Sequence, residues 1–271
     1  MTMMMNNKAT LGNKALHNPY LDGDAFFWEA GSVGILLSHG FTATTAEIRL
    51  VADQFHTQGY TVAAPLLPGH GTKPEDLNNV HWRDWVASGE ESLQNLFGSC
   101  EQVWVAGTSM GGLLALYLAS QNPKISGSLL YAPAIRTMMS KMDLLQLYLG
   151  APLIKEIPRD SLDGSALWQG YPGLPLKGII QFLRFQSATL KRLSHIHQPV
   201  LIFQGRHDLT VAPEAAEIIM DRVSSEIKEH HWMEKSSHAI LLDEEYEEVA
   251  TLCIEFIKKV NEALPESNIA F

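Results

Sequence analysis

The residues from Gly107 to Gly111 have the types and spacing of a nucleophilic turn. Ser109 lies at the centre of the pattern G-x-S-x-G, between an apolar run at 103–106 and a second apolar run at 113–116. A sharp strand-to-helix turn strains the backbone of its central residue, and glycines on either side let the flanking backbones approach. The helix N-terminus would favour negative charge beside the hydroxyl. The pattern predicts a nucleophilic Ser109, against the alternative of an ordinary glycine-flanked turn.

A serine nucleophile needs a base, because its hydroxyl is weakly reactive at neutral pH. Among the eleven histidines, His238 follows a predicted strand at 228–233 through the polar loop 234–237 and precedes the last predicted helix. His230 and His231 lie within that strand and point to opposite faces. We therefore predict that His238 is the base.

An acid should orient the imidazole by accepting its Nδ1–H and by stabilising the imidazolium. Asp208 lies in the loop 205–208 that leaves a predicted strand at 199–204. Asp243 and Glu234 are alternatives, although Asp243 also suits a helix cap and Glu234 leaves a strand on which a carboxylate is often exposed. We favour Asp208.

Histidines can also bind a metal ion. His195 and His197 could share one face, but no third ligand accompanies them in the pattern. We predict no metal ligands.

The composition predicts a large buried core and excludes several classes of partner. Of 271 residues, 46% are hydrophobic and 18% charged, and the net charge of -10 comes without the basic stripe that nucleic acid requires. No apolar run has the length of a signal peptide or of a transmembrane segment. Cys100 and Cys253 are predicted to be free thiols, which fits a cytoplasmic location.

Predicted strands and helices alternate along the chain, which favours the α/β class with a mostly parallel central sheet flanked by helices. Thr44 and Glu47 form a capping-box pattern at the start of the first helix, and Asp243 is predicted to cap the last one. The strands are predicted at 33–38, 60–64, 102–107, 127–131, 199–204 and 228–233, and the helices at 44–59, 81–97, 109–120, 213–223 and 243–260.

About 65 residues between the fourth and fifth predicted strands contain no clear buried strand, which is too long for a plain crossover. This stretch is rich in Met, Leu and aromatic residues. We predict a small helical cap at 134–195, inserted in a core formed by 20–133 and 196–264; a separate domain is the alternative. Residues 1–19 and 265–271 are predicted to be loosely ordered ends.

Together these motifs resemble the α/β-hydrolase superfamily and, within it, the group of bacterial carboxylesterases and monoacylglycerol lipases. The stretches that carry the resemblance are His39-Gly40-Phe41-Thr42, Leu67-Pro68-Gly69-His70-Gly71, Val105-Ala106-Gly107-Thr108-Ser109-Met110-Gly111-Gly112, Gly205-Arg206-His207-Asp208 and Ser237-His238. They recur in the order that the family uses, with Ser first, acid second and His last.

The resemblance implies a catalytic triad of Ser109, Asp208 and His238. It also implies an oxyanion hole formed by the backbone N–H groups of Phe41 and Met110, with His39 in a structural hydrogen-bonding role. Members of the family use no metal and no cofactor.

The expected activity is hydrolysis of a small apolar carboxylic ester through an acyl-enzyme on Ser109. An apolar cap over a serine at a helix N-terminus agrees with this expectation. A carbon–carbon bond hydrolase or a thioesterase on the same triad is one alternative. A non-catalytic module that binds a small ligand is another.

Overall fold

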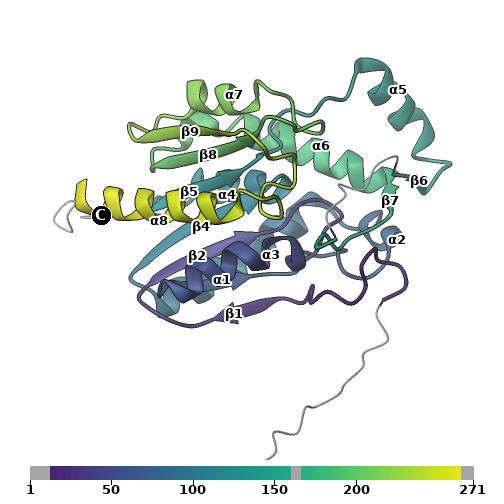
Figure 1. The fold of residues 1–271 in the computed structure, drawn as a ribbon. Coiled ribbons are helices and arrows are strands. Elements are labelled where there is room, and N and C mark those ends of the chain that lie inside the picture. The colour runs from purple at the N-terminus through teal and green to yellow at the C-terminus, as the bar shows by residue number, and fades with distance from the viewer. Residues whose placement is uncertain (1–12, 160–165, 264–271) are drawn as a thin grey trace, which may run out of the picture.

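The computed structural model describes residues 13–159 and 166–263, and in this part of the chain one seven-stranded sheet forms the centre of the molecule (Figure 1). Its strand order is β1-β3-β2-β4-β5-β8-β9, and every neighbouring pair is parallel except β1 with β3. The predicted mostly parallel sheet is confirmed. The strands are β1 (Phe26–Trp28), β2 (Val33–Ser38), β3 (Thr61–Ala64), β4 (Gln102–Thr108), β5 (Gly127–Tyr131), β8 (Val200–Gly205) and β9 (Lys228–Met233).

The central strands are mostly apolar and buried because both of their faces are covered. All residues of β3, β5 and β8 are buried, as is nearly all of β2 and β4. The parallel register pairs Ser38 with Gly107 and Thr108 with Tyr131. The carboxyl ends of β2, β4 and β5 therefore meet at one edge of the sheet, and the loops that follow them are brought together there.

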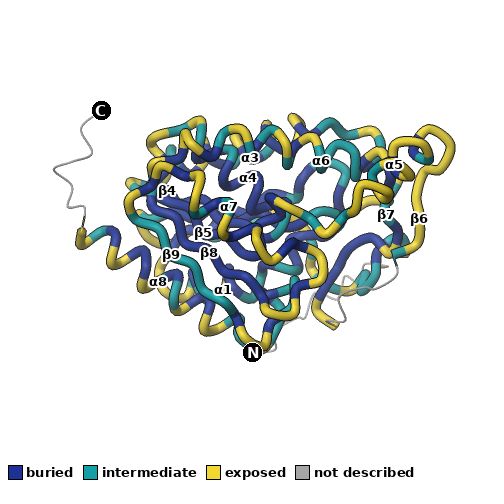
Figure 2. Tube along the Cα trace, turned by 90° about the horizontal axis from the view of Figure 1, so that it is seen from above, coloured by how far each residue is buried: buried dark blue, intermediate teal, exposed yellow. Residues whose placement is uncertain are grey.

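Helices cover both faces of the sheet (Figure 2). The sheet separates two hydrophobic clusters of the core, one on each face. On one face, α1 (Arg49–Thr57) and α8 (Tyr246–Ala263) bury Phe55 and Phe256 among their apolar residues. On the other, α3 (Trp82–Ser99), α4 (Met110–Ala119) and α7 (Ala215–Arg222) pack with Trp85 and Ile219. All residues of α4 except Tyr117 are buried, so the helix after Ser109 is fixed on every side.

The segment between β5 and β8 holds α5 (Lys141–Gly150), β6 (Glu156–Pro158), β7 (Gly173–Pro175), α6 (Leu176–Leu190) and the 3-10 turn η2 (Leu193–His195). β6 and β7 form an antiparallel pair apart from the main sheet (Figure 1). The sequence did not predict these strands because each has three residues and ends in proline. The predicted cap includes 160–165, which lie outside the described residues.

The predicted capping box at Thr44 and Glu47 is only half formed, because Thr44 is the N-cap of the first turn but Glu47 does not complete the box. Thr44 Oγ1 accepts a hydrogen bond from Ala46 N at 3.3 Å, but the Glu47 carboxylate accepts from Gly40 N and not from Thr44 N. Thr44 N donates to Gln169 O instead. The expected single helix is a 3-10 turn, η1 (Thr45–Ile48), followed by α1.

The predicted cap of the last helix by Asp243 is wrong, because α8 begins at Tyr246. Asp243 Oδ2 accepts from Ser237 N at 2.7 Å and from Ser237 Oγ at 2.9 Å. Asp243 could bind either the end of the helix or a neighbouring loop. The donors near it in the folded protein decide between them, and the local sequence does not show those donors.

Part of the N-terminal end that we predict to be loosely ordered makes specific contacts. His17 N donates to Gly170 O at 2.8 Å, Asn18 Nδ2 donates to Trp168 O at 2.8 Å, and Leu16 is buried. Residues 13–19 therefore lie against the segment that follows β6. Residues 1–12 and 264–271 lie outside the described part of the chain.

Within the described ranges, no helix has the length and apolar character needed to cross a membrane.

Candidate active site

Ser109 lies at the sharp turn between β4 and α4, in a backbone conformation that residues other than glycine rarely adopt. Its φ is 54° and its ψ is -111°. Ser109 N donates to Tyr131 O at 2.9 Å, and Ser109 O accepts from Ala134 N at 3.1 Å. These bonds to the end of β5 and to the segment after it hold the strained turn in place.

The two glycines of the G-x-S-x-G pattern are required by close backbone approach. A Cβ on Gly111 would clash with the carbonyl of Ser38 and would lie 2.8 Å from His39 O. A Cβ on Gly107 would fall on the carbonyl of Gly111 and lie 2.8 Å from Gly112 N. The pattern therefore lets β2, the serine turn and α4 pack directly against one another.

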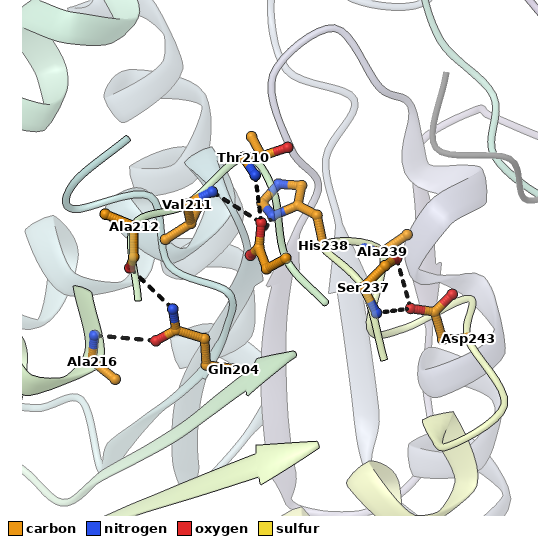
Figure 3. A network of polar contacts seen from close by, with 10 residues as sticks. Gln204, Thr210, Val211, Ala212, Ala216, Ser237, His238, Ala239 and Asp243 are labelled. Atoms are coloured by element: carbon orange, nitrogen blue, oxygen red, sulfur yellow. Dashed lines mark hydrogen bonds and ion pairs between the residues drawn. The ribbon is translucent and has the colours of Figure 1, made fainter. Parts of the chain in front are cut away.

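His238 and Asp208 form a part-buried hydrogen-bonded pair. Figure 3 shows His238 beside Thr210 and Val211, whose N–H groups also bind the Asp208 carboxylate. The distance from His238 Nδ1 to Asp208 Oδ2 is 2.9 Å, and the side chains are 13% and 1% exposed. Asp208 Oδ1 accepts from Thr210 N at 2.7 Å and from Val211 N at 2.9 Å. Burial raises the pKa of Asp208, but hydrogen bonds from His238, Val211 and Thr210 outweigh it and lower that pKa below its ordinary value.

The other two acids that we considered for His238 are engaged elsewhere. Asp243 binds Ser237 and so fixes the loop that carries His238 (Figure 3). Glu234 Oε1 accepts from Arg206 Nε at 3.0 Å, in a pair whose side chains are 68% and 44% exposed. The geometry brings Asp208, from the loop after β8, to the Nδ1 side of the imidazole.

Ser109 and His238 line the same cavity, which has a volume of about 760 Å³. From the core come Gly40, Phe41 and Thr108, while the segment between β5 and β8 supplies most of the apolar wall. A mostly apolar cavity with a few converging polar groups is typical of a small-molecule site. The apolar wall includes Met138, Met139, Leu147, Ile154, Ile157, Leu174, Leu176, Ile179 and Phe182.

The two predicted oxyanion donors flank the serine turn. Met110 is the residue after Ser109, and a Cβ on Gly40, the residue before Phe41, would lie 3.4 Å from Ser109 Cβ. Neither Phe41 N nor Met110 N donates a hydrogen bond to another residue in the ranges that the structure describes. Backbone N–H groups of this kind can receive an anion at the end of a helix.

His39 is a fully buried structural residue in the neutral state. Its Nε2 accepts from Leu67 N at 3.0 Å, so Nδ1 carries the proton and donates to Gly40 O at 2.9 Å. Burial lowers the pKa of His39 from 6.5 to about 4, although the hydrogen bond to Gly40 O opposes that shift.

Glu47 is a site residue that our sequence analysis missed. It lines the cavity together with Ser109, and its carboxylate accepts a hydrogen bond from Gly40 N. The local pattern with Thr44 favoured a capping role, and nothing in the sequence connects residue 47 with residue 40. That contact depends on how η1 packs against the end of β2.

The remaining candidates from the sequence lie away from this site. His195 and His197 are both exposed, and no three His, Cys, Asp or Glu residues of the described chain are grouped as metal ligands. Cys100 is half-buried and Cys253 is buried, and both are free thiols.

The chain matches the model of the alpha/beta hydrolase family over residues 35–252. It is 36% identical over 247 residues to a thermostable monoacylglycerol lipase from Bacillus sp. (strain H-257), covering 89% of this chain and 97% of that protein. It is 30% identical over 247 residues to a carboxylesterase from Bacillus subtilis (strain 168), covering 87% and 96%.

Solved structures show the same architecture. One from work on LipS and LipT, two metagenome-derived lipolytic enzymes, superposes with a TM-score of 0.83 at 31% identity, covering 88% of this chain and 99% of that chain. A soluble variant of monoglyceride lipase from Saccharomyces cerevisiae, in complex with a substrate analogue, has a TM-score of 0.72 at 20% identity over 93% and 96%. At 20% identity, the similarity to the yeast structure shows only that the fold is shared.

Proposed function

Because this chain belongs to the alpha/beta hydrolase family, we propose that it is a carboxylic ester hydrolase that works through an acyl-enzyme on Ser109. The observation that carries the proposal is a strained serine and a carboxylate-paired histidine on the wall of one apolar cavity. A serine, a base and an orienting acid in this chain order are typical of the family. The relatives named as a monoacylglycerol lipase and a carboxylesterase support the same activity.

In the proposed reaction Ser109 Oγ attacks the ester carbonyl carbon while His238 Nε2 takes the hydroxyl proton. Asp208 holds the Nδ1–H of the ring, which leaves Nε2 as the acceptor. The N–H groups of Phe41 and Met110 donate to the oxyanion of the tetrahedral intermediate. When the carbon–oxygen bond to the alcohol breaks, His238 returns the proton to the leaving oxygen. A water molecule then attacks the carbonyl carbon of the acyl-enzyme while His238 takes its proton. The bond to Ser109 Oγ breaks, His238 returns the proton to that oxygen, and the carboxylic acid is released.

We assign residues 134–195 the role of a cap that shapes the substrate cavity over a core formed by 20–133 and 196–264. Support comes from the cavity wall, since most of its apolar residues belong to this insertion. A small apolar ester such as a monoacylglycerol fits that wall, and the Bacillus sp. lipase is named for that substrate. A cytoplasmic location is supported by the two free thiols.

The test is labelling with a fluorophosphonate, which reacts with an activated serine. The wild-type protein should be labelled at Ser109, and Ser109→Ala should lose both the label and nearly all ester turnover while it keeps the fold. A panel of p-nitrophenyl esters, monoacylglycerol, acyl-CoA and a vinylogous diketo acid identifies the reaction class. Wild-type rates in Ser109→Ala, or turnover confined to acyl-CoA or the diketo acid, would end the ester-hydrolase proposal.

A further inference from the structure

The loop that carries the proposed oxyanion donor Phe41 is bound by an acid from a different element. Glu47 lies in η1, and its Oε1 accepts the hydrogen bond of Gly40 N. The same side chain lines the cavity with Ser109. The proposed reaction steps do not use this carboxylate, but it contacts the loop that carries Phe41.

The peptide on the other side of Gly40 is fixed as well. Gly40 O accepts from His39 Nδ1 at 2.9 Å and from Ala43 N at 3.3 Å. This carbonyl and the N–H of Phe41 belong to one peptide unit, and in a trans peptide the two groups point in opposite directions. The donors that hold the carbonyl therefore turn the Phe41 N–H away from themselves. Glu47 accepts the hydrogen bond of Gly40 N, which belongs to the peptide unit before Gly40. Both peptide units that contain Gly40 atoms are therefore held in one orientation.

Gly40 lies close to both Glu47 and the serine turn. A Cβ on Gly40 would lie 3.0 Å from Glu47 Oε1 and 3.4 Å from Ser109 Cβ. The bond from Gly40 N to the Glu47 carboxylate opposes movement of the loop from this position. The Glu47 carboxylate therefore binds the loop at the residue that lies beside Ser109.

The charge of Glu47 does not itself favour the proposed reaction, because a carboxylate near a developing oxyanion repels it. As an acceptor, however, a carboxylate forms a stronger bond to a backbone N–H than a neutral group does. We infer that Glu47 is a positioning residue that holds the Gly40–Phe41 loop in the orientation needed to stabilise the oxyanion. This inference rests on the proposed function.

The test compares two substitutions of similar length. Glu47→Gln keeps a carbonyl oxygen that can accept from Gly40 N, whereas Glu47→Met removes the acceptor and preserves most of the volume. Loss of one oxyanion donor costs about 100- to 1,000-fold in kcat, and loss of its orientation should cost less, about 10- to 100-fold. We expect that loss in Glu47→Met with KM within about twofold of wild type, and kcat within about threefold in Glu47→Gln.

A tetrahedral adduct gives a second readout. Phenylboronic acid bonds to a serine hydroxyl and places an oxygen where the oxyanion would form, so its Ki should rise in Glu47→Met in parallel with the loss of kcat/KM. Glu255→Ala, on the exposed side of α8, is the control and should match wild type in both measurements. The melting temperature of each variant is measured to establish that the variant is folded under the assay conditions.

Wild-type kcat and Ki in a folded Glu47→Met would overturn the inference. An equal loss in Glu47→Gln and Glu47→Met would overturn it too, because the acceptor would then not be what matters. A wild-type protein that hydrolyses no ester and takes no fluorophosphonate label would instead remove the proposed function. The two failures are therefore distinguishable.

Discussion

At the scale of single residues, the site depends on how buried polar groups are satisfied. Asp208 receives hydrogen bonds from His238, Thr210 and Val211, so its charge is compensated although its side chain is 1% exposed. Among the acids that we compared at the sequence level, Glu234 is largely exposed and its pairing with Arg206 is of the kind that contributes little to stability. Neutralising Asp208 should therefore lower ester turnover far more than neutralising Glu234.

Asp208→Asn should lower kcat by about 10³- to 10⁴-fold, because an amide cannot fix the tautomer and stabilise the imidazolium as a carboxylate does. Glu234→Gln is the matched control and should stay within about twofold of wild type. Ester turnover at saturating substrate measures both variants. A comparable loss in Glu234→Gln would move the orienting role away from Asp208.

His39 should make stability depend on pH. Its pKa is about 4 in the folded protein and 6.5 as the ordinary value, so between these pH values the unfolded chain binds a proton that the folded one does not. Stability is therefore complete above pH 6.5 and falls by about 3 kcal/mol from this residue as the pH drops to 4.

The measurement is denaturant unfolding of wild type and His39→Gln from pH 7 to pH 4. The variant should be less stable at pH 7 but should lose less stability on acidification, because it has no proton to bind at this position. Parallel curves for the two proteins would contradict the assignment of a neutral buried imidazole.

At the scale of elements, the serine turn requires β2, β4 and α4 to approach more closely than side chains allow. Gly111 faces the carbonyl of Ser38 and Gly107 faces Gly111 itself. Gly98, in α3, has open space around the position of a Cβ. The same substitution should therefore have opposite effects at 111 and at 98.

Gly111→Ala should destabilise the protein by about 3 kcal/mol or more, because the methyl group would force the helix away from β2. Gly98→Ala should stabilise it by about 0.5–1 kcal/mol through helix propensity. Free energies of unfolding from denaturant titration test both. A Gly111→Ala variant as stable as wild type would show that the helix can shift freely.

At the scale of the whole molecule, Gln169 connects three distant parts of the chain. Its Nε2 donates to Asn18 O at 3.0 Å and to Leu21 O at 2.7 Å, and its Oε1 accepts from Thr44 Oγ1 at 2.8 Å. The side chain is buried. It thus joins the insertion between β5 and β8 to the N-terminal segment and to the turn before η1.

Gln169→Ala should destabilise the protein by about 2–4 kcal/mol, since it leaves buried groups without partners. Gln121→Ala, at an exposed position, should change stability by less than about 0.5 kcal/mol. Thermal and denaturant unfolding measure the difference. If the two variants were equally stable, Gln169 would not be a connection on which the fold depends.

Short-range patterns in the sequence were sufficient to predict most strands of the sheet and the turn that carries Ser109. Apolar runs predicted six of the seven strands of the main sheet, and G-x-S-x-G between a strand and a helix placed Ser109 at a turn, because backbone sterics and burial act over a few residues. The three-residue strands β1, β6 and β7 were missed, since so short an element depends on its pairing partner.

Only the tertiary structure decided which distant polar groups meet. Thr44 and Glu47 matched a capping box and Asp243 matched a helix cap, yet Glu47 binds Gly40 and Asp243 binds Ser237. The sequence favoured Asp208 as the partner of His238, and the structure shows that contact, whereas the contact of Glu47 with Gly40 was not predicted. Both contacts involve loops at the carboxyl ends of parallel strands. Their proximity is set by strand order and helix packing across the whole chain, and no local spacing contains that information.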